Sequence, residues 1–454
     1  MAAVHYYGTF YASIDLPLPH PLLIRPLSKQ PTPRFYNRGS NLDLGTCRHI
    51  SHPDFQLRIM SDSNNGKSRL SSEDWANLPD PILTHIFSHL TVVDRCRSAG
   101  VCHHWKHCLE IPLLWRKFSC GFFLPSSGKL IKCVEKYGCH VRDLSIELNQ
   151  SQRENRANAV AALDHLASLS EPRLTHLTIS FRGENPLFYA GQEFTSALCR
   201  LFQAIGKSRE CSLKYLNLKG LESNFTDEFV NSLGTNCKNL EYLNILNKVL
   251  ICNIAPQSMV DLIKNCKKLK VLHLYHASLS NEVLNALAQP DRQPLIKLGV
   301  VCRRQEKYGE DLTAEAWSNL TARSPSLKVE LGFDHTCPLH RVSEIMKPEI
   351  PVQELHLLTF CRIYPEVRLA ASFYNDTLVK LVTYTRPSKE LEDALLEVAQ
   401  RCSLLHTLYV YCVVRKETVD KILEMCPVMK KAKTYILKSE IEPEPWTVGQ
   451  EEGD

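Results

Sequence analysis

The sequence predicts an α/β protein in which a small helical unit precedes a curved solenoid with a concave parallel sheet and convex helices. A compact helical pattern covers residues 78–118. Strand-like segments in a recurring frame of cysteine and leucine follow from about residue 130, and helical segments separate them. We therefore divide the chain into an extension, a helical domain, a solenoid and a tail, at residues 1–70, 75–120, 130–435 and 436–454.

The helical unit begins at the segment LPDPILTHIF, Leu78 to Phe87. Pro79 suits the first helical position, and the apolar residues that follow form one stripe of Ile82, Leu83, Ile86, Phe87 and Leu90. Asp94 is expected to cap a second helix whose inward residues are Cys96, Ala99, Val101, Cys102 and Trp105. Pro112 starts a third short element. About forty residues in three short pieces cannot close a stable core, so the unit needs an external packing partner.

The rest of the chain is a repeat. The segments CKNLEYLNIL at 237, CKKLKVLHLY at 266 and CSLLHTLYVY at 402 share a cysteine followed by apolar residues three, six and eight positions later. The middle leucines recur every 26 to 29 residues where neighbouring copies are clear, at Leu216, Leu243, Leu272, Leu298, Leu355, Leu381 and Leu408. This period is typical of leucine-rich repeats, and segments such as TDEFVNSLGTNC supply one helix per copy. A doubly wound sheet also alternates strands and helices, but the fixed period argues against it.

Composition and charge exclude several classes of function. The 454 residues carry a net charge of only +5 with scattered Lys and Arg, which argues against a nucleic-acid partner. No apolar run reaches the roughly 18–20 residues that span a membrane. The 18 cysteines and the missing secretory signal favour a cytoplasmic or nuclear protein with reduced thiols. The proline-rich residues 1–70 are interpreted as disordered rather than as a transit peptide, and their role stays open.

The segment LPDPILTHIFSHLTVVDRCRSAGVCHHWKHCLEIPLLW resembles the F-box motif. With the repeats behind it, the chain resembles the F-box/leucine-rich-repeat family over residues 75–446. The resemblance implies a non-catalytic substrate-recognition subunit of an SCF-type E3 ubiquitin ligase. Its F-box would bind a Skp-type adaptor, and through it a cullin scaffold with a RING subunit, while the solenoid binds a protein substrate for ubiquitination. The adaptor-binding residues so implied are Leu78, Pro79, Ile82, Leu83, Ile86, Phe87, Leu90, Trp105, Leu114 and Trp115, the two tryptophans mainly as internal braces.

Residues that alternate with the buried leucines should face the concave side of the solenoid. The candidate substrate-binding residues are Tyr215, Asn217, Tyr242, Asn244, His273, Tyr275, His356, Tyr384, Tyr409 and Tyr411. Tyrosine suits recognition because it offers apolar area and a polar tip, although it also simply suits strands. The insertion RGENPLFYAG, Arg182 to Gly191, is either a functional loop or a spacer.

The densest metal-like cluster comprises Cys96, Cys102, His103, His104, His107 and Cys108. It contains no Cys-x-x-Cys pair, and Cys102 has a packing role in the motif, so we expect no metal and no cofactor. The repeat cysteines Cys211, Cys237, Cys266, Cys402 and Cys426 are interpreted as core residues. The main alternative function is a stand-alone leucine-rich-repeat binder or inhibitor. A cysteine- or metal-dependent enzyme ranks last.

Overall fold

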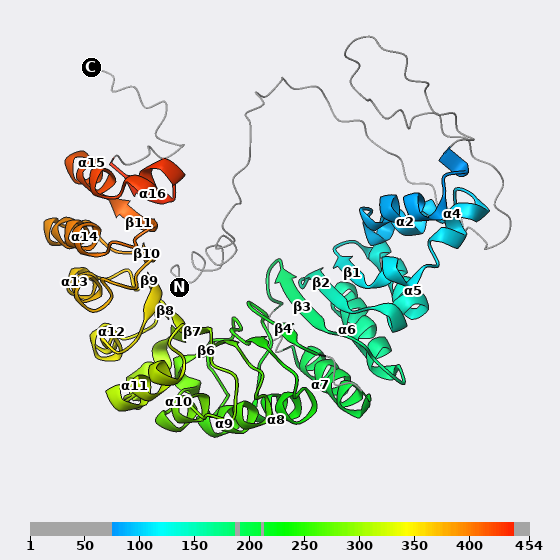
Figure 1. The fold of residues 1–454 in the computed structure, drawn as a ribbon, viewed down its shortest axis with the longest axis horizontal. Coiled ribbons are helices and arrows are strands. Elements are labelled where there is room, and N and C mark those ends of the chain that lie inside the picture. The colour runs from blue at the N-terminus through cyan, green and yellow to red at the C-terminus, as the bar shows by residue number, and fades with distance from the viewer. Residues whose placement is uncertain (1–74, 187–190, 210–212, 440–454) are drawn as a thin grey trace, which may run out of the picture. The chain divides into compact units, whose positions relative to one another are not determined.

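The computed structural model describes residues 75–186, 191–209 and 213–439, so the predicted extension and most of the predicted tail lie outside the described residues. From Pro79 onward the chain forms one unit. Its twelve strands make one sheet in sequence order, and the sheet follows an arc with the strands on the inner side and the helices on the outer side (Figure 1). This arrangement confirms the predicted solenoid with a concave sheet and convex helices.

Each strand pairs in parallel with its sequence neighbours. Segments that lack the cysteine of the repeat frame, such as HVRDLSIE from His140 and DTLVKLVT from Asp376, also contain strands of the sheet. The strands are β1 Lys117–Phe122, β2 Asp143–Asn149, β3 His176–Arg182, β4 Tyr215–Asn217, β5 Tyr242–Asn244, β6 Val271–Tyr275, β7 Lys297–Cys302, β8 Lys328–Phe333, β9 Val352–Leu357, β10 Lys380–Thr383, β11 Thr407–Val413 and β12 Tyr435–Lys438.

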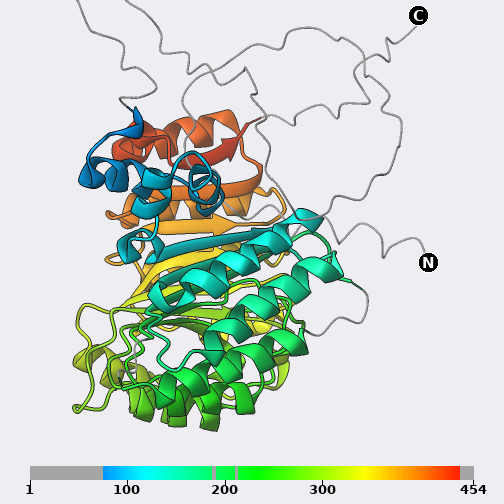
Figure 2. The same cartoon turned by 90° about the vertical axis from the view of Figure 1, so that its right-hand side faces the viewer.

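The connecting helices form a layer outside the strands, as the two views show together (Figures 1 and 2). None of the described helices is both long and apolar enough to cross a membrane. The helices of this layer are α5 Lys129–Tyr137, α6 Arg153–Ser168, α7 Gln192–Lys207, α8 Asp227–Asn236, α9 Pro256–Asn265, α10 Asn281–Leu287, α11 Ala314–Arg323, α12 Leu339–Ile345, α13 Tyr364–Phe373, α14 Lys389–Arg401, α15 Lys416–Met425 and α16 Pro427–Ala432.

Residues 79–116, which we call the helical unit, contain α2 Asp80–Ser88, α3 Val92–Ser98, α4 His103–Cys108 and the 3-10 turn η2 Pro112–Trp115. The predicted second helix is thus split in two. Thr91, not Asp94, caps α3 by accepting a hydrogen bond from the Asp94 amide. Val101, expected to face inward, is 62% exposed. The split of the helix and the exposure of Val101 both follow from the turn at Gly100 and Val101, since glycine weakens a helix interior.

The core of the solenoid lies between the sheet and the helices. The seven leucines predicted as the middle residues of the repeat are all fully buried, and Leu216, Leu243 and Leu272 pair directly across β4, β5 and β6. The repeat cysteines Cys237, Cys266, Cys402 and Cys426 are buried as predicted, whereas Cys211 lies outside the described residues. Each buried leucine of this kind contributes about 2–5 kcal/mol relative to alanine.

The register of the sheet shifts between β8 and β9, in the middle of the solenoid, and again between β11 and β12. Val329 pairs with Val352, but Glu330 pairs with Glu354, so one extra residue bulges from β9. Leu298 therefore pairs with Val329, while Leu355 pairs with Leu331. The single leucine column predicted from the spacing is two columns, because a bulge inserts a residue that the repeat period does not reveal.

The predicted insertion Arg182 to Gly191 is described only in part, because residues 187–190 lie outside the described residues. Gly191 has a φ of 65° and directly precedes α7. A Cβ atom there would lie 2.2 Å from the Ser223 hydroxyl oxygen. Glycine is therefore required by both backbone conformation and space at this end of the insertion.

Candidate functional site

Helix α2 divides its apolar residues between two faces. Leu83 and Phe87 point into the helical unit and are 1% exposed. Ile82 and Ile86, four residues apart and hence neighbours on the helix surface, are 49% and 36% exposed. Pro79 is exposed, and Leu78 and Leu90 are half-buried. The predicted single stripe is thus two rows: Leu83 and Phe87 face inward, and Ile82 and Ile86 are exposed.

Arg95 holds the helical unit together from inside. Its guanidinium donates hydrogen bonds to the carbonyls of Phe87 and Ser88, both at 2.9 Å, and to the carbonyl of Leu114. Burial lowers the pKa of Arg95. One buried cation thereby joins the C-terminal end of α2 to η2, satisfying carbonyls that a helix end leaves without partners.

The two tryptophans brace this unit differently. Trp115 is 1% exposed, donates its indole N–H to the Leu109 carbonyl at 2.6 Å, and stacks on Tyr137 of α5 with ring centroids 3.7 Å apart. Trp105 is half-buried and meets Phe87 edge to face at 5.3 Å. Leu114 is also buried. Of the predicted adaptor-binding residues, Leu83, Phe87, Leu114 and Trp115 are thus internal, and a contact with a partner stays a prediction for all ten.

Further aliphatic side chains of the helical unit are uncovered. Val93, Val101 and Leu113 are 40%, 62% and 57% exposed. With Ile82 and Ile86 they make up what we call the aliphatic surface. The sequence analysis missed Val93 and Leu113 as surface residues, although each stands beside an apolar residue that is buried, Val92 or Leu114. Five aliphatic side chains of this small unit are thus exposed.

On the concave face, aromatic side chains stack along neighbouring strands. The rings of Tyr215 and Tyr242 lie 4.1 Å apart at an angle of 15°, flanked by His176 at 5.5 Å and by His273 at 5.9 Å. We call these four residues the first ladder. Burial raises the pKa of Tyr215 to about 12, so its hydroxyl stays protonated at neutral pH.

A second ladder lies toward the C-terminal end of the sheet and consists of Phe360, Tyr384 and Tyr411. Tyr384 and Tyr411 stack at 4.1 Å and 14°, and Phe360 meets Tyr384 at 5.4 Å. Phe360 is 53% exposed and Tyr411 is 38% exposed. Tyr409, also predicted, is half-buried on the same strand as Tyr411. Large, partly exposed rings with polar tips are suited to protein recognition.

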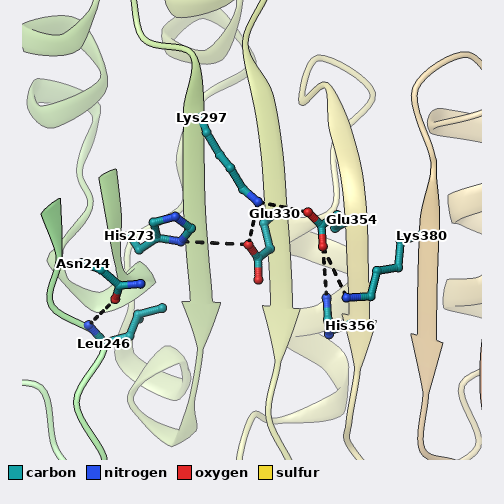
Figure 3. Close-up of polar contacts among 8 residues, drawn as sticks. All are labelled: Asn244, Leu246, His273, Lys297, Glu330, Glu354, His356 and Lys380. Atoms are coloured by element: carbon teal, nitrogen blue, oxygen red, sulfur yellow. Dashed lines mark hydrogen bonds and ion pairs between the residues drawn. The ribbon is translucent and has the colours of Figure 1, made fainter. Parts of the chain in front are cut away.

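Between the ladders lies an ionic cluster of His273, Lys297, Glu330, Glu354, His356 and Lys380 (Figure 3). The Lys297 ammonium lies 3.2 Å from a carboxylate oxygen of Glu330 and 3.0 Å from one of Glu354. Lys380 lies 3.4 Å from Glu354. Only the two histidines were predicted here, although each of the other four residues directly precedes a buried leucine of its strand.

The pKa values in this cluster reflect its pairing. The pKa of Glu354 is held well below its ordinary value, first by His356, whose ring nitrogen lies 3.9 Å from the carboxylate, and then by Lys297 and Lys380. Burial raises the pKa of Glu330, but Lys297 outweighs it and the net shift is downward. Burial lowers the pKa of His273, against the opposing effect of Glu330. At neutral pH two lysines therefore balance two carboxylates, which leaves the cluster a polar surface with paired charges.

Other predicted substrate-binding residues serve the local structure. Asn217 and Asn244 accept hydrogen bonds through their side-chain oxygens from the amides of Lys219 and Leu246, both at 3.1 Å, where their strands end. Tyr275 is 5% exposed and donates its hydroxyl to the Asn247 carbonyl. The guanidinium of Arg303 lies 4.1 Å from the centre of the Tyr275 ring.

Two residues of the predicted histidine and cysteine cluster, His104 and Cys108, lie next to Asp80. Within the described residues, ligand atoms of Asp80, His104 and Cys108 lie within 4.8 Å of one another, as do those of Glu330, Glu354 and His356. The sequence analysis did not consider Asp80 for this cluster. His104 pairs with Asp80 at 3.4 Å, and the Cys108 thiol donates to Asp80 at 3.5 Å. In the first trio, the ion pair and the hydrogen bond to Asp80 explain why the three side chains lie close together. In the second trio, Lys297 and Lys380 pair with the carboxylates.

Comparison with known proteins shows which family has this combination of a helical unit and repeats. Residues 75–121 match the F-box-like family model. The chain is 33% identical over 378 residues to human F-box/LRR-repeat protein 8, an alignment that covers 83% of this chain and 98% of that protein. It is 32% identical to the mouse protein of that name, with 82% and 97% covered. Mouse F-box/LRR-repeat protein 21 is 26% identical, with 74% and 76% covered.

The chain belongs to the F-box/LRR-repeat family. The segments RGENPLFYAG, LAQPDRQP and YILKSEIEPEPW had indicated the narrower resemblance to F-box/LRR-repeat protein 8, and the alignments to the human and mouse proteins confirm it. The F-box match ends at residue 121, inside β1. In this F-box/LRR-repeat protein the first strand of the sheet is therefore continuous with the F-box, and Trp115 stacked on Tyr137 packs the F-box against the first repeat.

Proposed function

We propose that this chain is the substrate-recognition subunit of an SCF-type E3 ubiquitin ligase. The observation that carries the proposal is the aliphatic surface on a unit that matches the F-box-like model. Exposed aliphatic groups on a unit of about forty residues are explained by a protein that covers them, and a Skp-type adaptor is the partner that the F-box implies. A cullin scaffold and its RING subunit would join through the adaptor.

The concave face supports the second half of the proposal. The two ladders expose stacked rings, whereas the charges between them are paired with one another. We propose that the ladders supply most of the affinity for a protein substrate and that the ionic cluster keeps the sheet rigid between them. The proposed contribution to ubiquitination is proximity, because a tethered substrate has a raised effective concentration near the conjugating enzyme. The chain itself would be non-catalytic.

The location in this proposal is the cytoplasm or the nucleus, where an SCF-type ligase acts. The cysteines of the described residues are all free thiols, which suits a reducing compartment.

Capture from cell extract tests the proposal. We compare the full chain with the double variant Ile82→Asp and Ile86→Asp. The matched control is Val428→Asp, on α16, where the native valine is 62% exposed. Loss of adaptor and cullin from the double variant alone supports the proposal, and proteins retained by all three chains become substrate candidates. If the native chain captures no adaptor, the stand-alone binder is the better function.

A further inference from the structure

Two thiols meet where the F-box contacts the first repeat. The sulfur of Cys96, on α3, lies 2.9 Å from the sulfur of Cys133, on α5. A disulfide has a sulfur–sulfur bond of about 2.05 Å, so only a small movement separates this contact from a bond. The two residues are 37 positions apart and come from different parts of the fold.

The surroundings of Cys96 favour its thiolate. The thiol of Cys133 donates a hydrogen bond to it, and Lys136 and Arg95 add positive charge, which together lower the pKa of Cys96 to about 7 despite its partial burial. The pKa of Cys133 is raised by the same contact with Cys96 and by burial. At neutral pH Cys96 is therefore partly in its thiolate form, with the shared proton on Cys133.

Access distinguishes this pair from a nearby cysteine. Cys96 and Cys133 are both half-buried, so neither residue is sealed in the core. Cys120 of β1 is fully buried, and burial raises its pKa to about 12. A reactive thiol requires both thiolate character and access, and Cys96 has both while Cys120 has neither.

We propose that Cys96 and Cys133 form a thiol-modification site that reacts with small disulfides of the glutathione class and closes an internal disulfide between the F-box and the first repeat. The Cys96 thiolate attacks one sulfur of the external disulfide, forming a mixed disulfide and releasing one thiolate. Cys133 then displaces the second small thiol from Cys96, and its proton passes to that leaving group. The dithiol is oxidised by two electrons, and the external disulfide is reduced to two thiols.

The bond would lock α3 against α5 and so fix the F-box relative to the repeats. This consequence for the ligase rests on the proposed function, whereas the chemistry does not. Closing a 37-residue loop restricts the unfolded chain, so the oxidised protein should melt several degrees higher than the reduced protein.

The test incubates the reduced full chain with oxidised glutathione and maps the products by mass spectrometry. The proposal predicts a Cys96–Cys133 cross-link, with the loss of two hydrogens and without retained glutathione. Cys133→Ala should instead accumulate glutathione on Cys96, while the control Cys139→Ser, at an exposed cysteine, should still form the cross-link. A native chain that keeps glutathione on Cys96, or that leaves both thiols unreacted, would overturn the proposal.

Alkylation rates add a second readout that does not need the disulfide. Cys96 in the native chain should react with a midpoint near pH 7. In Cys133→Ala the midpoint should rise, because the hydrogen bond that most lowers the Cys96 pKa is removed. An unchanged midpoint in that variant would contradict the pairing even where the protein folds normally. Neither readout involves the adaptor, so failure here is separate from failure of the proposed function.

Discussion

The F-box and the concave face differ in the kind of apolar group that they leave exposed. In the F-box the aromatic Phe87 and Trp115 are internal, and aliphatic side chains such as Ile82 are exposed. On the concave face the aliphatic Leu216 and Leu381 are internal, and tyrosines are partly exposed. The solenoid has a continuous core and can leave its surface residues free for recognition. The F-box is too small for that, and part of its own hydrophobic surface stays uncovered.

The largest expected effect is Trp115→Ala. Removing a buried ring that stacks on Tyr137 should cost about 3–5 kcal/mol. Hydrogen exchange should show lost protection in α2 to α4, and little change around α14. The matched control is Trp317→Ala, a buried tryptophan of α11, which should loosen its own neighbourhood and spare the F-box. Equal loss of protection everywhere from either variant would mean that the two regions do not differ as we describe.

A smaller effect is expected from Lys297→Met, which leaves Glu330 and Glu354 without their shared cation. The cost should be about 1–2 kcal/mol at pH 7, between the values for exposed and for buried ion pairs. The control Lys328→Met changes an exposed lysine at the paired position of the next strand and should change stability by less than about 0.5 kcal/mol. Denaturant unfolding of both variants measures the difference.

The same cluster predicts an acid dependence. The pKa of Glu354 in the folded protein is below its ordinary value of 4.5, so its contribution is fully present above pH 4.5 and is lost as the pH falls below that value. The lowered pKa of His273 acts in the same direction from its ordinary value of 6.5 downward. Stability of the native chain should therefore fall on acidification, and Lys297→Met should flatten this dependence below pH 4.5. Parallel curves for the two proteins would contradict the pairing.

The smallest effect concerns the ladders. A double-mutant cycle to alanine on Tyr215 and Tyr242 should give a coupling of about 0.5–1.5 kcal/mol, and the cycle on Tyr384 and Tyr411 should agree with it. The two pairs have matching geometry, 4.1 Å with 15° and 14°. A coupling near zero in both cycles would show that the stacked rings do not stabilise one another. Their stacking would then have to serve the binding of a partner.

Much of the fold could be predicted because the repeat period is a property of local spacing. The buried column through Leu243 and Leu272 follows directly from it. The bulge at Gln353 could not be predicted, because one extra residue looks like ordinary variation in repeat length. The break between α3 and α4 had a signal in Gly100 that the sequence analysis did not use.

The candidate site could be predicted only where the alternation of side chains along a strand decides which face of the sheet a residue occupies. Tyr215, Tyr242, Tyr384 and Tyr411 were predicted on the concave face by strand parity and lie there as stacked pairs. Pairing partners were not predictable, because Lys297 meets Glu354 across 57 positions and an intervening strand. Likewise, no spacing rule brings Cys96 to Cys133.

The most direct test of the central claim is the affinity of purified Skp-type adaptor for the native chain and for Ile82→Asp with Ile86→Asp, measured beside their melting temperatures. We predict adaptor affinity at least about a hundredfold weaker for the double variant, since two charges would replace two anchors of the interface. Its melting temperature should stay close to that of the native chain, because both side chains are exposed. Equal adaptor affinity for both chains, or unfolding of the double variant, would contradict the assignment of the aliphatic surface as an interface.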